Sequence, residues 1–486
     1  MQKWAHDPYL DRQLEQQQQY IDQNATSHLR LRSLNRYFRS EISRLISSQV
    51  PEGSSVIDLG CGDGSLLSEI NASVAVGIDI APVLGVTEVT GGNTHIEIFQ
   101  SSIELFDFKQ LNRKFQYVVL SGVLEHVYDV LRILQSIQET IDTESRVIVV
   151  TYSRLWQPLF RLAEKMRLKA AMPTQNWIPV SEVENLANQS GLELVKTQRA
   201  ILIPFYVPLV SRWVNKWLAP LPVIRLLAFG HLTVLRKSNF LEVSKSVSVV
   251  IAARNESGNI KQLLDRMPRL AESQEIVFVE GGSTDDTWKV ISDEATRRVE
   301  ASYPFSIKFL QQTGKGKGDA VRKGFDSATG EILIILDADI SVPPEELPRF
   351  IQCLNSGNAD FVNGSRLVYG MEGGAMRFLN LLGNRFFGSL FSYLLGQQVR
   401  DTLCGSKALT RDNYLRIVEN RGKFGDFDPF GDFDLLFGAA ALNLKIRDQP
   451  VHYKARTYGE TNISRFRHGW LLLRMSWVAA KKIKFV

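Results

Sequence analysis

Two acidic residues one position apart follow a strongly apolar run in the second half of the chain. Asp337 and Asp339 come just after ILII at 332–335. Side chains alternate along a strand, so we expect these carboxylates to point the same way and to repel each other. A divalent cation bound with a diphosphate removes that repulsion, and oxygen ligands favour Mg²⁺ or Mn²⁺. The spacing therefore predicts a metal and diphosphate site at Asp337 and Asp339.

A glycine-rich turn in the first half predicts a second site. Gly60, Gly62 and Gly64 follow the strand-like run that contains Asp58. Glycines allow a tight turn and the close approach of a ligand. Their G-x-G-x-G spacing differs from the G-x-G-x-x-G of dinucleotide loops. The next apolar run ends at Asp79, where a doubly wound fold places an acid against ribose hydroxyls.

Short strand-like runs alternate with helical stretches in both halves of the chain. This alternation predicts βαβ units and parallel sheets, so the expected fold class is α/β with two doubly wound domains. We expect a helical segment at 1–45, a first domain at 46–238 and a second domain at 246–486. A proline-broken helical insertion is predicted at 155–228, and the polar stretch 236–245 is the expected linker.

Composition excludes several classes of protein. The 486 residues carry a net charge of +5 without a dominant Lys/Arg block, so no nucleic-acid partner is expected. The cysteines, Cys61, Cys353 and Cys404, have no metal-site spacing and favour a reducing compartment. The N-terminus lacks the apolar core of a signal peptide, and no uncharged apolar run is long enough to span a bilayer. Oligomeric state is not indicated.

Three segments mix Trp, Phe and Leu with Arg and Lys, at 201–235, 378–396 and 469–486. That composition is typical of a surface that lies on a membrane. A large apolar interface between domains is the alternative. We expect a cytoplasmic protein bound peripherally to the cytoplasmic face of a membrane, with the basic C-terminal tail meeting anionic headgroups.

The first site resembles the class I S-adenosylmethionine-dependent methyltransferases over about 54–237. DLGCGDG at 58–64 resembles their motif I, and FQYVVLSGVLEHVYD at 115–129 resembles their fourth-strand block. The resemblance implies a Rossmann-like fold and S-adenosylmethionine as cofactor. The implied cofactor residues are Asp58, Gly60, Gly62, Gly64, Asp79, Ser102 and Ile103, with Asp79 on the ribose and the last two near adenine.

Methyl transfer needs alignment of donor and acceptor and sometimes a base. His126 is the candidate base. The alternative is that Glu125 and His126 only cap the strand and orient the cofactor. No motif for the methyl acceptor is readable, so a domain that binds the cofactor without catalysis stays open.

The second site resembles the family 2 glycosyltransferases of the GT-A fold over about 247–467. The matching blocks are SVVIAARNE at 248–256, VEGGSTDDT at 279–287, the G-K-G turn at 316–318 and LDADIS at 336–341. Glu280 stands where the family usually has an aspartate that contacts the base. The implied nucleotide-sugar residues are Ala253, Asn255, Glu256, Glu280, Asp285, Lys317, Gly318, Asp337 and Ala338.

Within that family the chain is similar to the dolichol-phosphate-mannose synthase type, whose acceptor is a polyprenyl phosphate. NGSR at 363–366 and HYKARTYGETNISRF at 452–466 carry the similarity, which implies Arg366 and Arg456 near the acceptor phosphate. A hydroxyl acceptor would need a base, for which Asp432 is the candidate and Asp434 the second choice. A phosphate acceptor is already ionised, and Asp432 would then position the acceptor or the sugar.

These expectations combine into a bifunctional enzyme. The second half is predicted to transfer a sugar from a nucleotide sugar to a polyprenyl phosphate, with a metal and with inversion. The first half is predicted to be an S-adenosylmethionine-dependent methyltransferase of unknown acceptor. The alternative is a transferase that acts on a glycan hydroxyl, joined to a non-catalytic S-adenosylmethionine-binding module.

Overall fold

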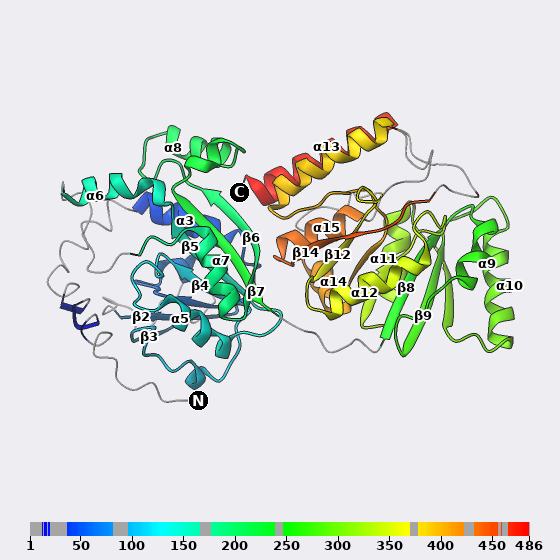
Figure 1. The fold of residues 1–486 in the computed structure, drawn as a ribbon, viewed down its shortest axis with the longest axis horizontal. Helices are drawn as coiled ribbons and strands as arrows, with labels where there is room; N and C mark the ends of the chain where they lie inside the picture. Colours follow the sequence, from blue (N-terminus) through cyan, green and yellow to red (C-terminus); the bar gives the residue numbers. More distant parts are fainter. Residues whose placement is uncertain are drawn as a thin grey trace. The chain divides into compact units, whose positions relative to one another are not determined.

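The computed structural model describes residues 12, 14–16, 18–19, 36–80, 96–165, 176–238, 246–369, 378–421, 432–454, 458 and 465–485. Contacts divide the chain into two compact units, one of residues 1–238 with 485–486 and the other of residues 239–484. Figure 1 labels the helices and strands of both units.

The N-terminal unit is built on a seven-stranded sheet. Its strands are β1 (Ser55–Leu59), β2 (Val74–Asp79), β3 (Ile96–Gln100), β4 (Tyr117–Ser121), β5 (Arg146–Tyr152), β6 (Leu192–Ala200) and β7 (Gly230–Lys237). They lie in the order β3-β2-β1-β4-β5-β7-β6. The pairs from β3 to β5 are parallel, and β7 runs antiparallel to both β5 and β6. The carboxyl ends of β1, β2, β4 and β5 therefore share one edge.

The N-terminal unit also contains helices and short helical turns. They are α3 (Arg36–Ser47), α4 (Ser65–Glu69), α5 (Val130–Ser136), α6 (Gln157–Lys165), α7 (Val180–Gln189) and α8 (Val210–Trp213), with the π-helical turn η4 (Val214–Leu218) and the 3₁₀ turns η1 (Phe108–Leu111), η2 (Ile137–Thr140), η3 (Arg154–Trp156) and η5 (Ile224–Leu227). Helix α3 buries Ile42, Leu45 and Ile46 against the core, as its amphipathic sequence requires.

The proline-broken helical insertion predicted at 155–228 also contains a strand of the sheet. Strand β6 lies inside it and pairs with β7 along its whole length. The helical segments therefore fall into two groups, η3, α6 and α7 before β6, and α8, η4 and η5 after it. Along β6, Leu192, Val195 and Ala200 are buried, and the pairing with β7 shifts register between Leu194 and Lys196. Strand β7 also extends to Lys237, two residues into the predicted linker.

The C-terminal unit has its own seven-stranded sheet. Its strands are β8 (Ser246–Ala253), β9 (Ser273–Glu280), β10 (Ser306–Gln311), β11 (Ile332–Ile335), β12 (Phe361–Ser365), β13 (Lys407–Thr410) and β14 (Ile446–Pro450). Their order is β10-β9-β8-β11-β13-β12-β14, and β13 is antiparallel to both of its neighbours. The fully apolar run of β11 is buried on both faces, as expected for a central strand.

The helices of this unit cover both faces of the sheet (Figure 1). They are α9 (Ser257–Asp265), α10 (Thr287–Glu300), α11 (Lys317–Ser327), α12 (Leu347–Asn355), α13 (Phe378–Leu395), α14 (Arg411–Glu419), α15 (Asp432–Ala441) and α16 (Arg465–Ala479), with η6 (Pro344–Glu346) and η8 (Ala480–Lys484). In the described parts of the chain, every helix is too short or too polar to cross a bilayer. Both units are α/β, which confirms the predicted fold class.

Candidate functional site

Three neighbouring parallel strands of the C-terminal unit end at the predicted nucleotide-sugar site. Strands β9, β8 and β11 lie side by side, and Ala253 at the end of β8 pairs with Glu280 at the end of β9. Strand β11 ends at Ile335, and the backbone amide of Leu336 still bonds to the carbonyl of Val250. Ligands of open α/β sheets bind beyond such carboxyl ends. The predicted residues on these three strand ends are therefore brought together.

Asp337 forms an ion pair with Lys317 across this edge. The Lys317 Nζ lies 2.6 Å from Asp337 Oδ1. Burial alone would raise the pKa of Asp337, but the charge and hydrogen bond of Lys317, with Arg366 and Lys407 further away, lower it. The ammonium of Lys317 thus neutralises a carboxylate that the sequence assigned to a metal.

Asp339 lies on a turn rather than on the strand. Its side chain is buried, and its Oδ1 accepts a hydrogen bond of 2.9 Å from the backbone amide of Ser341. Ile340 has a φ of 55°, in the left-handed region, so the chain turns sharply here. Strand alternation therefore does not set the directions of the Asp337 and Asp339 carboxylates, because β11 ends before both of them.

These carboxylates suit a hard divalent cation that keeps other ligands. Among the described residues, no group of three or more His, Cys, Asp or Glu side chains is close enough to enclose a metal by itself. Mg²⁺ usually binds one or two carboxylates and completes its shell with water and substrate phosphates. Two acids, one of them already beside a side-chain cation, fit that pattern.

Gly405 lies directly against the Asp337–Lys317 ion pair, and the sequence indicated no role for this glycine. A Cβ at this position would lie 2.2 Å from Asp337 Oδ2 and 2.3 Å from Lys317 Nζ. Contacts this short do not occur, so any larger residue at 405 would displace the charged ends of Asp337 and Lys317. The signal was in the sequence, in the CGSK block at 404–407, but only the fold shows which side chains it faces.

The loops after β8 and β9 are joined by reciprocal hydrogen bonds. Asn255 Oδ1 accepts from the amide of Thr284 at 2.8 Å, and the Asn255 amide donates to Ser283 Oγ at 3.0 Å. Asn255 has a φ of 58°, which asparagine tolerates better than most residues. Glu280 is buried and accepts from the Ser283 amide. The two loops therefore form a single framework.

Glu256 and Asp285 take part in the same framework. The Glu256 amide donates to Thr287 Oγ1 at 2.9 Å, and the Glu256 carboxylate accepts from Asn259. Asp285 accepts from the amides of Thr287, at 3.0 Å, and Ser257, at 3.3 Å. Their carboxylates hold the loops in place, and contact with a nucleotide stays a prediction for both.

Tyr458 reaches this framework from near the C-terminus. Its hydroxyl lies 3.1 Å from Ser257 Oγ, and its ring covers Gly258 so closely that a Cβ there would approach the ring to 2.7 Å. The sequence gave no role to this tyrosine. Arg456, two residues earlier and predicted to bind the acceptor phosphate, lies outside the described residues.

The predicted phosphate ligand Arg366 is tied to a buried aspartate. Its Nε and Nη2 donate to the two oxygens of Asp401 at 2.7 and 2.9 Å. Burial opposes ionisation of Asp401, but the Arg366 guanidinium lowers its pKa to about 2. This pair fixes the guanidinium, whose charge still reaches Asp337. Binding of an acceptor phosphate by Arg366 stays a prediction.

Asp434, the second choice for a base, is the centre of an ion-pair cluster. Its Oδ2 lies 2.7 Å from Arg421 Nε and 3.6 Å from Arg322 Nε, and the residue is buried. A carboxylate held in this way is poorly suited to accept a substrate proton. Helix α15 begins at Asp432, whose side chain lies outside the described structure.

The glycine turn of the N-terminal unit requires glycine at all three positions. Gly60, Gly62 and Gly64 have φ values of 83°, 57° and 71°. A Cβ on Gly60 would also lie 2.1 Å from Cγ2 of Val123, in the loop after β4. The turn therefore brings the loops after β1 and β4 into direct contact at the carboxyl edge.

Two acids flank this turn. Asp79, at the end of β2, accepts a hydrogen bond of 2.7 Å from the Gly62 amide through Oδ2. Asp58, at β1, is buried, and its Oδ1 has no hydrogen-bond partner. Burial, with the nearby charge of Asp79, raises the pKa of Asp58 to about 7. A buried carboxylate oxygen without a partner suits a positively charged ligand such as S-adenosylmethionine.

An ion pair that the sequence did not predict fixes the same turn from outside. Arg39 on α3 lies 2.6 Å from Asp63 Oδ1 and also donates to Ser65. Burial would raise the pKa of Asp63, but the bonds from Arg39 and Ser65 lower it to about 2. Arg39 precedes the turn by more than twenty residues, so spacing could not reveal this contact.

The predicted adenine loop is connected to the loop after β4. Ser102 Oγ accepts from the Glu104 amide at 3.3 Å, and Ile103 is buried in the core. Glu104 Oε1 accepts from the amides of Tyr128 and Asp129 at 3.0 and 3.1 Å. Glu104 thus positions both loops, while the contacts of Ser102 and Ile103 with adenine stay predictions.

His126 lies half-buried in the loop after β4, and its amide donates to Val123. Its neighbour Glu125 is buried, accepts from the Tyr152 amide at 3.2 Å, and has a pKa raised to about 7 by burial. The carbonyl of Glu125 accepts from Asn176. Glu125 therefore helps to hold this loop through Oε1, while its Oε2 is buried without a hydrogen-bond partner, like Asp58 Oδ1. A base role for His126 stays a prediction.

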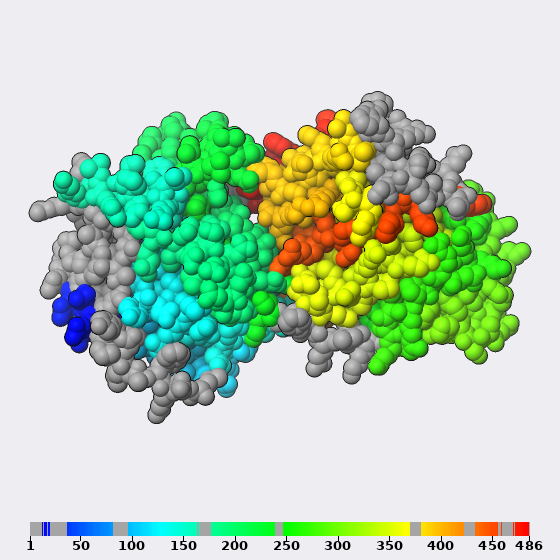
Figure 2. All heavy atoms as spheres, in the orientation of Figure 1, coloured from blue at the N-terminus to red at the C-terminus, as the bar shows by residue number. Residues whose placement is uncertain are grey.

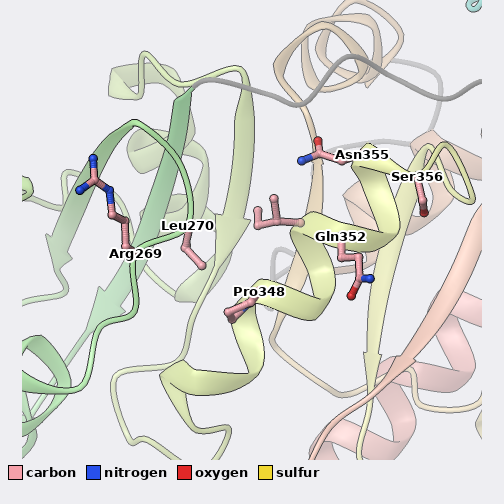
Figure 3. Close-up of a pocket in the computed structure, with 7 residues that line it drawn as sticks. Arg269, Leu270, Pro348, Gln352, Asn355 and Ser356 are labelled. Atoms are coloured by element: carbon pink, nitrogen blue, oxygen red, sulfur yellow. The ribbon is translucent and has the colours of Figure 1, made fainter.

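A shallow hollow elsewhere in the C-terminal unit does not coincide with the acidic site. Its volume is about 400 Å³, and it is lined by Arg269, Leu270, Pro348, Ile351, Gln352, Asn355 and Ser356 (Figure 3). Five of these residues lie on or just after α12, which leads away from the Asp339 turn. The strand ends, not this hollow, carry the charged groups suited to chemistry.

Comparisons with known proteins identify a family for each of the two units. Residues 30–197 match the family described as a methyltransferase domain, and residues 248–416 match glycosyl transferase family 2. The hexosyltransferase Agl6 of low-salt glycan biosynthesis from Haloferax volcanii is 28% identical over 243 residues, which are 49% of this chain and 55% of Agl6. The dolichyl-phosphate hexose transferase of the same organism is 29% identical over 225 residues, 46% of this chain and 89% of that protein.

A crystal structure of glucosyl-3-phosphoglycerate synthase from Mycobacterium tuberculosis with phosphoglyceric acid is 20% identical. It has a TM-score of 0.35 and covers 49% of this chain and 80% of its own. The family matches agree with the two sheets and their loops. The N-terminal unit is a methyltransferase domain, and the C-terminal unit is a family 2 glycosyltransferase domain homologous to hexosyltransferases.

Proposed function

We propose that the C-terminal unit transfers a sugar from a nucleotide sugar to a polyprenyl phosphate. The observation that carries this proposal is the Asp337–Lys317 pair beside Asp339, at the shared carboxyl edge of three strands. Lys407, buried and bonded to Asn363 Oδ1, adds positive charge toward Asp337. A site with two acids among several cations suits a ligand that brings both a metal and phosphates.

The nucleotide sugar would lie over the framework formed by the loops after β8 and β9. Asn255 and Glu280 fix those loops, and Ala253, Glu256, Asp285 and Ala338 line the same edge. Lys317 and Gly318, the first two residues of α11, would meet the diphosphate. Backbone amides at a helix N-terminus favour such an anion.

Asp337 and Asp339 would hold Mg²⁺ or Mn²⁺. When bound, the cation supplies positive charge against the charge that develops on the leaving diphosphate. Lys317 would then be free to turn from Asp337 toward a phosphate oxygen. The carboxylates keep the donor in one orientation for a single displacement, which inverts the anomeric centre.

The acceptor would be the phosphate of a polyprenyl lipid. A phosphate is ionised at neutral pH and attacks without a strong base, so Asp432 would position the acceptor or the sugar. Arg366, fixed by Asp401, and Arg456 would bind the phosphate. The name of the dolichyl-phosphate hexose transferase, a relative over most of its length, supports this class of acceptor.

The acceptor lipid would be reached at the surface of a membrane. Helices α13 and α16 pack together (Figure 1), and they expose large apolar side chains beside cations. The exposed residues are Leu382, Phe386, Trp470, Leu473, Arg474 and Trp477, together with Lys481 and Lys482 of η8, which follows α16. Trp and cations beside apolar side chains are typical of peripheral binding to anionic lipid, here expected at the cytoplasmic face.

The N-terminal unit would bind S-adenosylmethionine and transfer its methyl group to an unidentified acceptor. Gly60, Gly62 and Gly64 would let the cofactor approach the backbone. Asp79, beside the Gly62 amide, would hold the ribose, and Asp58 would face the positive charge of the cofactor. Mass spectrometry of the products made with labelled cofactor tests this. No methyl transfer despite binding would leave a module that only senses the cofactor.

Sugar transfer is tested with radiolabelled nucleotide sugars and short polyprenyl phosphates, with and without Mg²⁺ or Mn²⁺. We expect a labelled lipid product only when a divalent cation is present. Turnover on a soluble glycan, without any lipid product from the common donors, would overturn the proposal.

A second candidate is transfer to a glycan hydroxyl, and the name of Agl6, a hexosyltransferase of glycan biosynthesis, favours it. In that reaction Asp432 would be the base. Replacing Asp432 with Asn should abolish glycan transfer but only slow transfer to a phosphate, so the size of the loss separates the two candidates.

A further inference from the structure

A helical turn of the methyltransferase domain has its polar side inside and its apolar side outside. In the segment formed by α8 and η4, Ser211 is completely buried and Asn215 is 4% exposed. On the opposite side Leu209 is 92% exposed and Trp213 55% exposed. A helix on the surface of a soluble protein normally shows the reverse arrangement. The outer side of this segment therefore combines large apolar side chains with the exposed cations Arg212 and Lys216.

The buried polar residues hold this segment in a fixed shape. Asn215 Oδ1 accepts from the amides of Leu202 and Ile203 at 2.9 Å, and its Nδ2 donates to Tyr37 Oη at 3.0 Å. Ser211 Oγ accepts from the Val207 amide and donates to the Phe205 carbonyl, each at 2.8 Å. The exposure of Leu209 and Trp213 therefore follows from satisfied hydrogen bonds.

Neighbouring segments extend the apolar surface. Val223, Leu226 and Leu227, around η5, are exposed, as are Leu155 and Leu159 of η3 and α6. The indole of Trp156 donates to the Leu227 carbonyl at 3.0 Å, which ties the two segments together. Figure 2 shows the segment from 201 to 229, in green, standing at the surface of its own unit. We call the exposed apolar residues of 155–162 and 205–227 the apolar cap.

The apolar cap lies at the edge of the sheet that carries the cofactor turn. Strand β6 is antiparallel to β7, which is antiparallel to β5, so β6 runs in the direction of β5. Tyr152 and Ala200, the last residues of β5 and β6, both pair with Gly230. The segments that follow them, which form the apolar cap, thus leave the sheet at its carboxyl edge. Figure 1 shows α6 and α8 at one end of this unit.

The charges of residues 201–229 indicate which kind of partner this surface would bind. From 201 to 229 the sequence contains no Asp or Glu, whereas it contains Arg212, Lys216 and Arg225. Lys216 is exposed and lies over the ring of Trp217. A surface that binds another protein would be expected to carry both acidic and basic residues. This segment combines aromatic and aliphatic groups with cations and has no acids, which matches acyl chains below anionic headgroups.

We propose that the apolar cap docks the methyltransferase domain on an anionic lipid bilayer. The four prolines of this segment, at 204, 208, 220 and 222, and its three cations fit a surface that lies in the interface. The cofactor edge then faces the lipid, so the methyl acceptor is a molecule held in the bilayer. This inference stands without the proposed sugar acceptor, because it rests on the N-terminal unit alone.

A fluorescent probe on Leu209 tests the docking directly. Leu209→Cys is prepared in the full chain with Cys353→Ser, since Cys61 and Cys404 are buried, and is labelled with an environment-sensitive dye. Vesicles of phosphatidylcholine with phosphatidylglycerol should raise its emission about threefold or more, and lipids brominated on their acyl chains should quench it. The matched control is Val299→Cys on α10 of the other unit, also strongly exposed, whose label should not respond.

Vesicle sedimentation separates this surface from helices α13 and α16. Leu209→Glu with Trp213→Glu should weaken partition into anionic vesicles at least tenfold, while Val299→Glu should not. Trp470→Glu with Trp477→Glu should weaken it independently. A Leu209 label that ignores vesicles while the protein sediments with them would overturn the proposal. The proposal would also be overturned if the Leu209 label were protected from iodide quenching in the absence of vesicles. That result would mean that another part of the protein, or a second copy, covers the apolar cap.

Discussion

The two sites of this chain use acidic residues in opposite ways. In the glycosyltransferase domain Asp337 is ionised and paired with Lys317, so the acid is already compensated before any ligand arrives. In the methyltransferase domain Asp58 is buried without a partner for Oδ1, and its pKa is raised to about 7. In the proposed reactions, Asp337 would exchange its contact with Lys317 for a metal ion, whereas Asp58 would gain a positively charged partner only when the cofactor binds.

The two sites also differ in how many of their proposed ligands the sequence indicates. The sugar site has acids, a lysine and buried cations for both donor and acceptor, and each is fixed by neighbours. The methyltransferase domain has a glycine turn with three positive φ values, and the apolar cap is exposed at the same carboxyl edge of its sheet. Phosphate and metal sites leave acidic and basic residues that can be read in a sequence, whereas an apolar surface leaves only exposed apolar residues.

The largest expected effect is on the acid pair. Asp337→Asn removes the charge that faces Lys317 and the proposed metal, and sugar transfer should fall by about 10³-fold, measured as kcat/KM for the nucleotide sugar. Binding of S-adenosylmethionine should stay within twofold. Asp326→Asn is the matched control, because Asp326 lies near the end of α11 opposite to Lys317. The amide oxygen of the new Asn can still accept the hydrogen bond from the Tyr414 hydroxyl. Equal losses in both variants would contradict the assignment.

The next effect concerns the glycine turn of the other site. Gly60→Ala combines a φ of 83° with a contact of 2.1 Å to Val123, so affinity for S-adenosylmethionine should fall by about 100-fold in calorimetry. Adding Val123→Ala relieves the contact but not the backbone strain and should restore only part of the affinity. Sugar transfer should not change, and a parallel loss there would show that the two sites are not independent.

The third prediction concerns Gly405→Ala, which should lower sugar transfer only by displacing the side chains of Asp337 and Lys317. In Gly405→Ala the Cβ displaces Asp337 and Lys317, and kcat/KM for sugar transfer should fall by roughly 10- to 100-fold. The melting temperature should move by a few degrees only, because the contact is with side chains at an open edge. Full activity in this variant would mean that the observed Asp337–Lys317 arrangement is not the working one.

The smallest effect is on stability against pH. Asp58 has a folded pKa of about 7 against an ordinary value of 3.8, so the folded domain holds this proton more tightly than the unfolded chain. Its contribution is therefore complete below about pH 4 and is lost as the pH rises toward 7. Asp58→Asn should flatten this part of the melting-temperature profile.

The matched control for this experiment is Glu69→Gln, an exposed acid at the end of α4. Its profile should follow that of the wild type. An Asp58→Asn profile that keeps the full decline between pH 4 and 7 would place the effect on another group, and Glu125, with its own pKa of about 7, is the next to replace.

The sequence predicted the features that depend on neighbours along the chain. Strand ends, the glycine turn and the placing of Asp337 and Asp79 at carboxyl edges follow from local patterns. Contacts between distant segments could not be predicted, such as Arg39 with Asp63, Gly405 behind Asp337, or Arg366 with Asp401. The prediction that strand alternation sets the direction of the Asp339 carboxylate was wrong. Strand β11 ends four residues before Asp339, and Asp339 lies on the turn that follows.

The central claim is sugar transfer to a polyprenyl phosphate at the Asp337 site. It is tested most directly by the mass of the lipid product from full-length protein, a nucleotide sugar, Mg²⁺ or Mn²⁺ and a short polyprenyl phosphate. We predict the mass of the acceptor plus one glycosyl residue, absent with Asp337→Asn. Glycosylation of a soluble glycan with the lipid unchanged, or an undiminished lipid product from Asp337→Asn, would contradict the claim.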